Sequence, residues 1–387
     1  MNAHHPAATA ALLSLAASLG PACSSTSSSG RAGPLDLLYV AVQSTNVIAA
    51  LSLDAKTGAP TPIAGSPFAL GAGSSPTAIA TNGRFVFTSN AASGNVSSFG
   101  VDSSNGALRE IELSPFALDQ QPFSELPMVV SPSGGSLYLS SFGGGGITVF
   151  DIGTDGALSP IVGSPFAADG TQVGGRPFDI AIDPSGAHLY ALAQGVPPHV
   201  TGVLEYDIDP NTHALSKRRE LPTGNLVSPR MAIEKTGKVL FFTDALGNQI
   251  GSILLDAAGG ASIGATSGND PGATGPLRLL SDPSGRFLFA TNYQTDVVSA
   301  FTISDADGTL APSVPGAPYA TSSHPQSLAF HPGGAGFIYV ADAGTGDLAA
   351  FAMDAATGGL TPLAGSPFAI GPGIGASILP MTALELE

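Results

Sequence analysis

The sequence has no tryptophan, a single cysteine and few charged residues. Charged side chains make up 11% of its 387 residues, and 13 Lys and Arg stand against 29 Asp and Glu, for a formal net charge of −16. The longest basic cluster is Lys217–Arg219, whereas nucleic-acid binding requires a concentrated basic surface. We therefore predict no nucleic-acid partner. Because Cys23 has no second cysteine to pair with, an intrachain disulfide is excluded.

Glycine and proline are abundant where charge is scarce. The chain contains 50 Gly and 32 Pro, and 7% of its residues are aromatic. This composition suits short strands joined by many tight turns rather than long helices or disorder. We predict an all-β protein.

The first thirty residues differ in kind from the rest. Residues 7–19 form an uncharged stretch rich in Ala and Leu, which is too short to span a membrane and is typical of an export signal. Cys23 is followed by a serine-rich segment, and in this position it resembles the lipidated cysteine of a bacterial lipoprotein. The alternative is that Cys23 is an incidental residue in a leader that is discarded. We predict an export signal at 1–22 and a tether at 23–34. The mature protein would be a periplasmic or outer-membrane lipoprotein, or it would be secreted. It would contact a membrane only through a lipid attached to Cys23.

Seven aromatic residues recur at intervals of 47 to 52 residues, each within a short apolar stretch. They are Tyr39, Phe87, Tyr138, Tyr190, Phe242, Phe289 and Tyr339. A period of this length is typical of toroidal or solenoidal repeat proteins. Because the repeat runs through residues 35–387, we expect one domain there.

Each repeat shows the pattern of four strands. Residues 177–183 alternate apolar and polar side chains, Pro184-Ser185-Gly186 forms a turn, and residues 187–193 resume the alternation, which predicts a hairpin. A third strand at 203–208 and a weaker fourth strand complete the unit. Four antiparallel strands in each of seven repeats predict a seven-bladed β-propeller. Ser-Pro-Phe-Ala ends several fourth strands, and we interpret its aromatic residue as a plug between blades.

The order of strand types predicts how the ring closes. The first repeat begins with its aromatic second strand, at Leu37, and has no first strand before it. The first strand that it lacks is expected near the C-terminus, within 374–382. The C-terminal strand would then complete the blade that the N-terminal segment begins. Such a joint leaves no free sheet edge.

Charged residues gather around the loops that lead into the first strands. The four leading residues are Arg176, Arg230, Arg278 and His324, and two acidic residues flank such loops, Glu125 and Asp179. Guanidinium groups match carboxylate or phosphate oxyanions, and imidazole transfers protons near neutral pH. The alternative is that the arginines form salt bridges between blades and that Asp179 bonds neighbouring backbone.

Other catalytic patterns have little support in the sequence. The histidines lack the spacing of metal ligands, and no Gly-x-Ser-x-Gly elbow of a serine hydrolase is present. We predict neither a metal nor another cofactor.

The framework of the repeat resembles one known family. Pro177–Gly186, Leu189-Tyr190 and Val203–Ile208 are similar to the repeat of the seven-bladed lactonases, which include bacterial 6-phosphogluconolactonase and fungal muconate-lactonising enzymes. The resemblance implies metal-independent opening or closing of a lactone ring at the channel mouth by histidine, arginine and an acidic residue. Leu126–Met128 and Arg176–Phe178, where an early histidine would be expected from the family, contain none.

These observations lead to one expected function and one alternative. We expect a monomeric lactone hydrolase in which Arg176, Arg230, Arg278 and Asp179 bind the substrate. Proton transfer would fall to His324 or Glu125. The alternative is a non-catalytic envelope propeller that binds a ligand or a protein partner on the same face.

Overall fold

The computed structural model describes most of the chain after residue 33. The described residues are 34–118, 125–141, 146–167, 176–194, 201–224, 226, 230–255, 261–304, 307–311, 314–334, 336–377 and 380–386. The predicted export signal at 1–22 and Cys23 lie outside them, as does all of the predicted tether except Pro34. Within the described part, no helix is long and apolar enough to cross a membrane.

The described strands form seven antiparallel sheets, which we number as blades one to seven. Blade one contains β32 (Met381–Leu386), β1 (Leu35–Val42), β2 (Val47–Leu53), β3 (Pro60–Pro62) and the short β4 (Phe68–Ala69). Blade two contains β5 (Pro76–Thr81), β6 (Phe85–Asn90), β7 (Asn95–Val101), β8 (Leu108–Glu110) and β9 (Phe116–Ala117). Blade three contains β10 (Met128–Val130), β11 (Ser136–Ser141), β12 (Gly146–Ile152), β13 (Leu158–Pro160) and β14 (Phe166–Ala167).

The remaining four blades follow in chain order. Blade four contains β15 (Arg176–Ile182), β16 (His188–Gln194), β17 (Gly202–Ile208) and β18 (Leu215–Pro222). Blade five contains β19 (Met231–Ile233), β20 (Val239–Asp244), β21 (Gln249–Leu255) and β22 (Ala261–Gly268). Blade six contains β23 (Pro276–Ser281), β24 (Phe287–Asn292), β25 (Val297–Thr302) and β26 (Tyr319–Ala320). Blade seven contains β27 (Pro325–Phe330), β28 (Phe337–Asp342), β29 (Asp347–Met353), β30 (Leu360–Pro362) and β31 (Phe368–Ala369).

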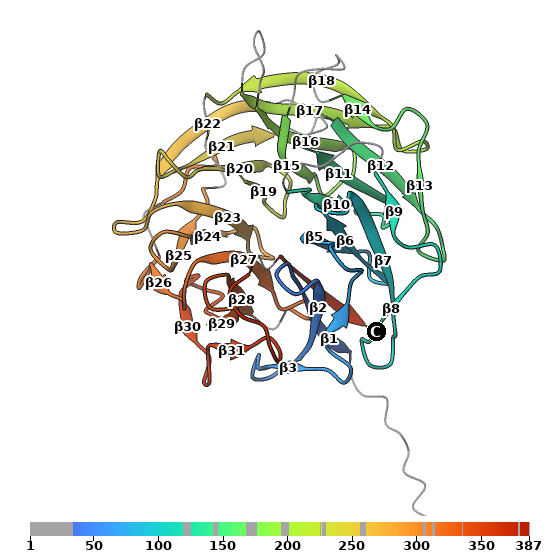
Figure 1. Cartoon of the computed structure of the whole chain (residues 1–387). Helices are drawn as coiled ribbons and strands as arrows, with labels where there is room; N and C mark the ends of the chain where they lie inside the picture. Colours follow the sequence, from blue (N-terminus) through green and yellow to red (C-terminus); the bar gives the residue numbers. More distant parts are fainter. Residues whose placement is uncertain are drawn as a thin grey trace, which may run out of the picture. The chain divides into compact units, whose positions relative to one another are not determined.

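The first strands of the seven blades lie innermost, around the axis of the ring, which we call the channel (Figure 1). Each contacts the next in the order β5, β10, β15, β19, β23, β27 and β32, and β32 contacts β5 again. The blades therefore form a closed ring, as the seven-bladed propeller prediction requires.

The Pro-Ser-Gly turns set the hairpins between first and second strands. At Asp282–Gly285 the N–H of Gly285 donates to the Asp282 carbonyl at 2.9 Å, and Gly285 has a φ of 75°, a left-handed conformation that glycine adopts without strain. The Asp282 carboxylate also accepts the N–H groups of Arg286 and Phe287, both at 2.7 Å. The sequence of the turn thus fixes the register of the hairpin.

The predicted strand types are confirmed, and one span needs correction. All seven aromatic residues of the repeat lie in second strands, and the third strand expected at 203–208 is β17. The C-terminal first strand does pair with β1, but it spans Met381–Leu386 rather than 374–382. Its buried apolar residues, Met381, Leu384 and Leu386, explain the later position, because they are the ones that pack on the neighbouring blades.

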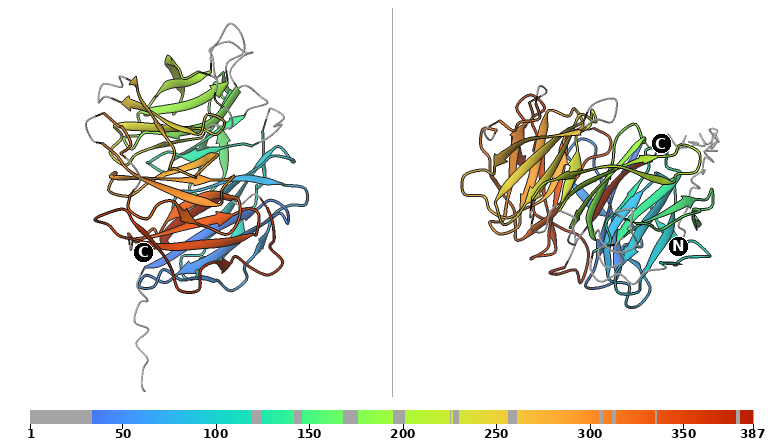
Figure 2. Two further views of the ribbon diagram at one scale, coloured as in Figure 1. Left: turned by 90° about the vertical axis from the view of Figure 1, so that its left-hand side faces the viewer. Right: turned by 90° about the horizontal axis from the view of Figure 1, so that it is seen from above.

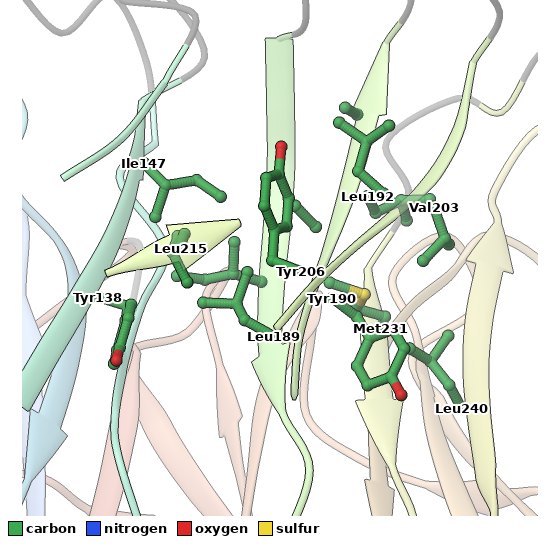
Figure 3. Packing of buried hydrophobic residues seen from close by; sticks show 14 of the residues in the cluster. Tyr138, Ile147, Leu189, Tyr190, Leu192, Val203, Tyr206, Leu215, Met231 and Leu240 are labelled. Carbon is green, nitrogen blue, oxygen red and sulfur yellow. The ribbon is translucent and has the colours of Figure 1, made fainter. Parts of the chain in front are cut away.

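The hydrophobic core lies between blades, which pack face to face (Figure 2). Figure 3 shows one such cluster, in which Tyr138 of blade three, Tyr190 of blade four and Leu240 of blade five belong to a single buried group. The aromatic residue of Ser-Pro-Phe-Ala also packs here, as predicted: Phe68 lies against a cluster that blades one and two share.

Buried tyrosines bond neighbouring blades to one another. The Tyr39 hydroxyl donates to the Gly106 carbonyl of blade two at 2.7 Å, and the Tyr339 hydroxyl of blade seven donates to the Gly58 carbonyl of blade one at 2.7 Å. Both aromatic side chains are fully buried. The second of these bonds spans the closure of the ring.

Deleting residues 376–387 is expected to open the ring. The deletion exposes β1 along the edge that β32 covers, and it removes three buried side chains worth about 1.5–3 kcal/mol each, a large part of a typical stability of about 5–15 kcal/mol. Urea unfolding should therefore lose cooperativity, and proteolysis should accelerate. Deleting residues 1–33, where no described strand lies, is the control. Equal stability of both deletions would contradict closure by β32.

Three second strands end in a buried polar residue beside a leading proline. Asn90, Asn292 and Asp342 pair with Pro76, Pro276 and Pro325, respectively, and all three side chains are inaccessible to solvent. Two of the three positions hold an uncharged amide. Burial raises the pKa of the Asp342 carboxyl to about 7, while the N–H of Ser322 at 3.3 Å opposes that rise.

The variant Asp342→Asn should be more stable than the wild type at alkaline pH. Because the folded-state pKa lies above the ordinary value of about 3.9, the stabilising effect of the bound proton is complete below about pH 4 and is lost as pH rises through about 7. The free energy of unfolding, measured from pH 4 to 8, should therefore fall less steeply in Asp342→Asn. The exposed change Glu112→Gln is the control, and parallel curves for Asp342→Asn and wild type would contradict the assignment.

Candidate active site

A cavity of about 190 Å³ lies in the channel at the end where the first strands begin. It is lined by 14 described residues, of which eight are apolar and six are polar. The polar ones are Thr77, Glu125, Asp179, Arg278, Gln326 and Ser327.

Bulges at the start of the first strands turn side chains into this cavity. In β5 and β27 the leading proline pairs normally, the following residue is skipped, and pairing resumes one residue later. The skipped residues are Thr77 and Gln326, and both line the cavity. Arg278 lies in the corresponding irregularity of β23. A bulge re-aims a side chain in this way, so these three irregularities bring Thr77, Gln326 and Arg278 into the polar lining.

Glu125 and Arg230 form an ion pair across the channel mouth. Glu125 lies in the loop before β10, and Arg230 immediately precedes β19, so the pair joins blade three to blade five. The Arg230 side chain is 8% exposed and the Glu125 side chain 35%. Thr243 fixes the Arg230 backbone, because its hydroxyl accepts the Arg230 N–H at 2.9 Å.

Asp179 and Arg278 form a second, looser pair from blade four to blade six. The Arg278 Nη1 atom lies 3.7 Å from Asp179 Oδ2, and the arginine side chain is 29% exposed. The N–H groups of Met231 and Ile180 donate to the Asp179 carboxylate at 3.0 and 3.1 Å. Asp179 therefore does both things that the sequence left open: its carboxylate accepts hydrogen bonds from neighbouring backbone, and it lines the cavity.

The two ion pairs interleave around one side of the channel. Each pair passes over one blade, so blades three to six are linked in alternation. Burial lowers the pKa of the Arg230 guanidinium, and the Arg278 charge lowers it further, while the contact with Glu125 favours the charged form. Burial raises the pKa of the Asp179 carboxyl, against the opposing effects of Arg278 and the two N–H donors. The site therefore holds two pairs, each of one acidic side chain and one guanidinium group.

His324 lies at the rim, apart from these four residues. Its ring stacks on Tyr293 with centroids 4.5 Å apart, and its Nδ1 is 3.1 Å from the Ser323 hydroxyl. Its backbone N–H donates to the Asp296 carboxylate at 2.6 Å, and its φ is 54°. Ser75 has the same left-handed backbone and the same kind of bond, to Asn46. The backbone of His324 is therefore a feature of the repeat, and its side chain is exposed and does not line the cavity.

The structure brings together four of the residues singled out in the sequence. Glu125, Asp179 and Arg278 line the cavity, and Arg230 contacts Glu125. Arg176 begins β15, but its side chain lies outside the described part of the structure. Sequence reasoning missed Thr77, Gln326 and Ser327, although their place after a leading proline was a usable signal. Among the described residues, no group of three or more histidine, cysteine and acidic side chains is placed to hold a metal ion.

Comparisons with known proteins agree with this architecture. A family model described as "Lactonase, 7-bladed beta-propeller" matches residues 38–374. No curated protein matches. The chain is similar in structure to a proposed 6-phosphogluconolactonase of Bacteroides uniformis (TM-score 0.74, 18% identity, 91% of this chain and 99% of the other). It is also similar to a periplasmic gluconolactonase of Pseudomonas aeruginosa (TM-score 0.71, 20% identity, 91% and 100%).

At these identities the solved structures support the fold alone. The family model spans most of the sequence, and the seven antiparallel sheets supply the blades that its description requires. The chain therefore belongs to the seven-bladed β-propeller lactonase family.

Proposed function

We propose that the protein hydrolyses a lactone in the channel cavity. The observation that carries this proposal is the convergence of Glu125, Asp179 and Arg278 on one cavity of about 190 Å³. Membership of the lactonase family and the gluconolactonase named among the similar structures support the choice of reaction.

Glu125 is the group that moves the proton. Its carboxylate lines the cavity and is partly exposed, and its only described charged partner is the Arg230 guanidinium. Glu125 takes a proton from a water molecule as the water oxygen attacks the ring carbonyl carbon. It then returns that proton to the ring oxygen as the bond between carbonyl carbon and ring oxygen breaks. The product is an open-chain hydroxy acid, and water supplies the added hydrogen and hydroxyl.

Arg278 stabilises the oxyanion that forms on the carbonyl oxygen. Its guanidinium lines the cavity, and its 3.7 Å contact with Asp179 is loose enough to leave N–H donors directed elsewhere. Donors placed in advance near a developing negative charge give a large part of the rate in such reactions. Asp179 positions Arg278, because two backbone N–H groups hold its carboxylate in place.

A second function is favoured by one observation. Each of the four charged side chains already contacts an oppositely charged one, which is also what a purely structural tie between blades would look like. In that case the protein would bind a ligand or partner at the mouth without catalysis.

We further propose that the chain is exported, in keeping with the periplasmic gluconolactonase that it is similar to. Cell fractionation of the wild type and of Cys23→Ala tests both export and lipid attachment.

Glu125→Gln should reduce kcat for hydrolysis of glucono-δ-lactone by about a hundredfold or more, the usual effect of losing a general base. Arg278→Lys should also reduce kcat, because lysine lacks the planar fork of donors. Acid release above the spontaneous rate, followed in a pH-stat, measures both. Glu112→Gln, which removes an exposed carboxylate elsewhere, is the control, and thermal unfolding of each variant separates loss of fold from loss of chemistry.

His324→Ala distinguishes the cavity from the rim. A loss as large as that of Glu125→Gln would assign proton transfer to His324 and contradict the role given to Glu125. Wild-type protein without activity above the spontaneous rate on any lactone would leave the non-catalytic alternative.

A further inference from the structure

The charges of the cavity balance within the protein itself. Glu125 and Asp179 contribute two negative charges, Arg230 and Arg278 contribute two positive charges, and each carboxylate contacts one guanidinium. The other lining residues are uncharged, and eight of the 14 are apolar. No charge of either sign is left over among the described side chains of the cavity.

The described basic side chains outside this group lie away from the mouth. Lys56 lies in the turn before β3 and Arg109 lies in β8, the outer strands of blades one and two. Arg84, Lys235, Lys238 and Arg286 lie in or next to the turns between first and second strands, at the opposite end of the first strands from the cavity. Lys217–Arg219 belong to β18, the outermost strand of blade four, and contact Glu205, Asp207 and Glu220. Around the mouth the further charges on described side chains are acidic, with Asp296 beside His324 and Asp342 beside Pro325. The side chain of Arg176, at the start of β15, lies outside the described part of the structure.

The proposed reaction keeps the cavity neutral only if the substrate is neutral. When Glu125 accepts the proton of water, its negative charge disappears and one negative charge appears on the carbonyl oxygen. The sum over Glu125, Asp179, Arg230, Arg278 and substrate is zero before and after this step. A phosphate dianion on the substrate would add two negative charges without a counter-charge among the described side chains of the cavity, and an unpaired charge is costly to bury.

We infer that the site takes a lactone without any ionised group, an uncharged sugar-type lactone rather than a phosphorylated or carboxylated one. The inference rests on the proposed function and names its substrate class. The ring lies against the apolar lining, its hydroxyl groups meet Thr77, Gln326 and Ser327, and the negative charge of the protein as a whole repels anionic substrates. Ring opening creates a carboxylate, which the balanced cavity does not retain.

The first test compares two lactones that differ by one phosphate group. For wild-type protein, kcat/KM on glucono-δ-lactone should exceed that on its 6-phosphate by about tenfold or more, a difference worth about 1.4 kcal/mol. Equal values, or a preference for the phosphorylated lactone, would overturn the inference while leaving lactone hydrolysis intact.

The second test does not depend on activity and uses inorganic phosphate as the probe. Phosphate in the millimolar range should leave the Tm of the wild type unchanged relative to chloride at equal ionic strength. In Glu125→Gln, which removes the carboxylate that contacts Arg230, phosphate should raise the Tm, whereas Glu112→Gln should behave as the wild type. If neither lactone is hydrolysed, the proposed function fails, and the phosphate test alone decides whether the site excludes anions. A rise in the Tm of the wild type with phosphate would contradict that exclusion.

Discussion

The pairing of β32 with β1 is the constraint on which the rest of the structure depends. Six residues of β32 pair antiparallel with β1. This pairing places β32, the first strand of blade one, between the first strands of blades seven and two. Without it the first strands would form an open arc, and the residues that line the cavity from β5, β27 and β32 would not face one another. Closure is therefore a condition for the site as well as for stability, because the cavity has walls only in the complete ring.

Within the closed ring, the site depends on charges that are neutralised in pairs. The contacts Glu125 to Arg230 and Asp179 to Arg278 each pass over a blade, so together they tie four blades at the channel mouth. Removing one partner would leave the buried member of the pair, Arg230 or Asp179, with an uncompensated charge. The pairing therefore explains how these charges are tolerated in a protein with few charged residues. The same balance shapes the chemistry, since a proton moved from water to Glu125 transfers negative charge to the substrate without changing the total.

The sequence predicts the scaffold well because every part of the scaffold repeats. The aromatic second strands, the Pro-Ser-Gly turns and the C-terminal closing strand all follow from local patterns, and only the span of that last strand was placed too early. The site is harder to predict, because its partners come from different repeats: Glu125 and Arg230 are 105 residues apart. Candidate residues could be found beside the leading prolines, but their pairing, the bulges that aim Thr77 and Gln326, and the outward position of His324 depend on how seven blades meet.

The central claim is that a neutral lactone binds between Glu125 and Arg278 inside the ring. A crystal structure of the protein with an uncharged lactam, the nitrogen analogue of a sugar lactone that resists hydrolysis, tests it most directly. We predict the lactam carbonyl oxygen within hydrogen-bond distance of the Arg278 guanidinium, with Glu125 within reach of a water beside the carbonyl carbon. A lactam bound at Tyr293 and His324, or a channel holding only water at saturating lactam, would contradict the account.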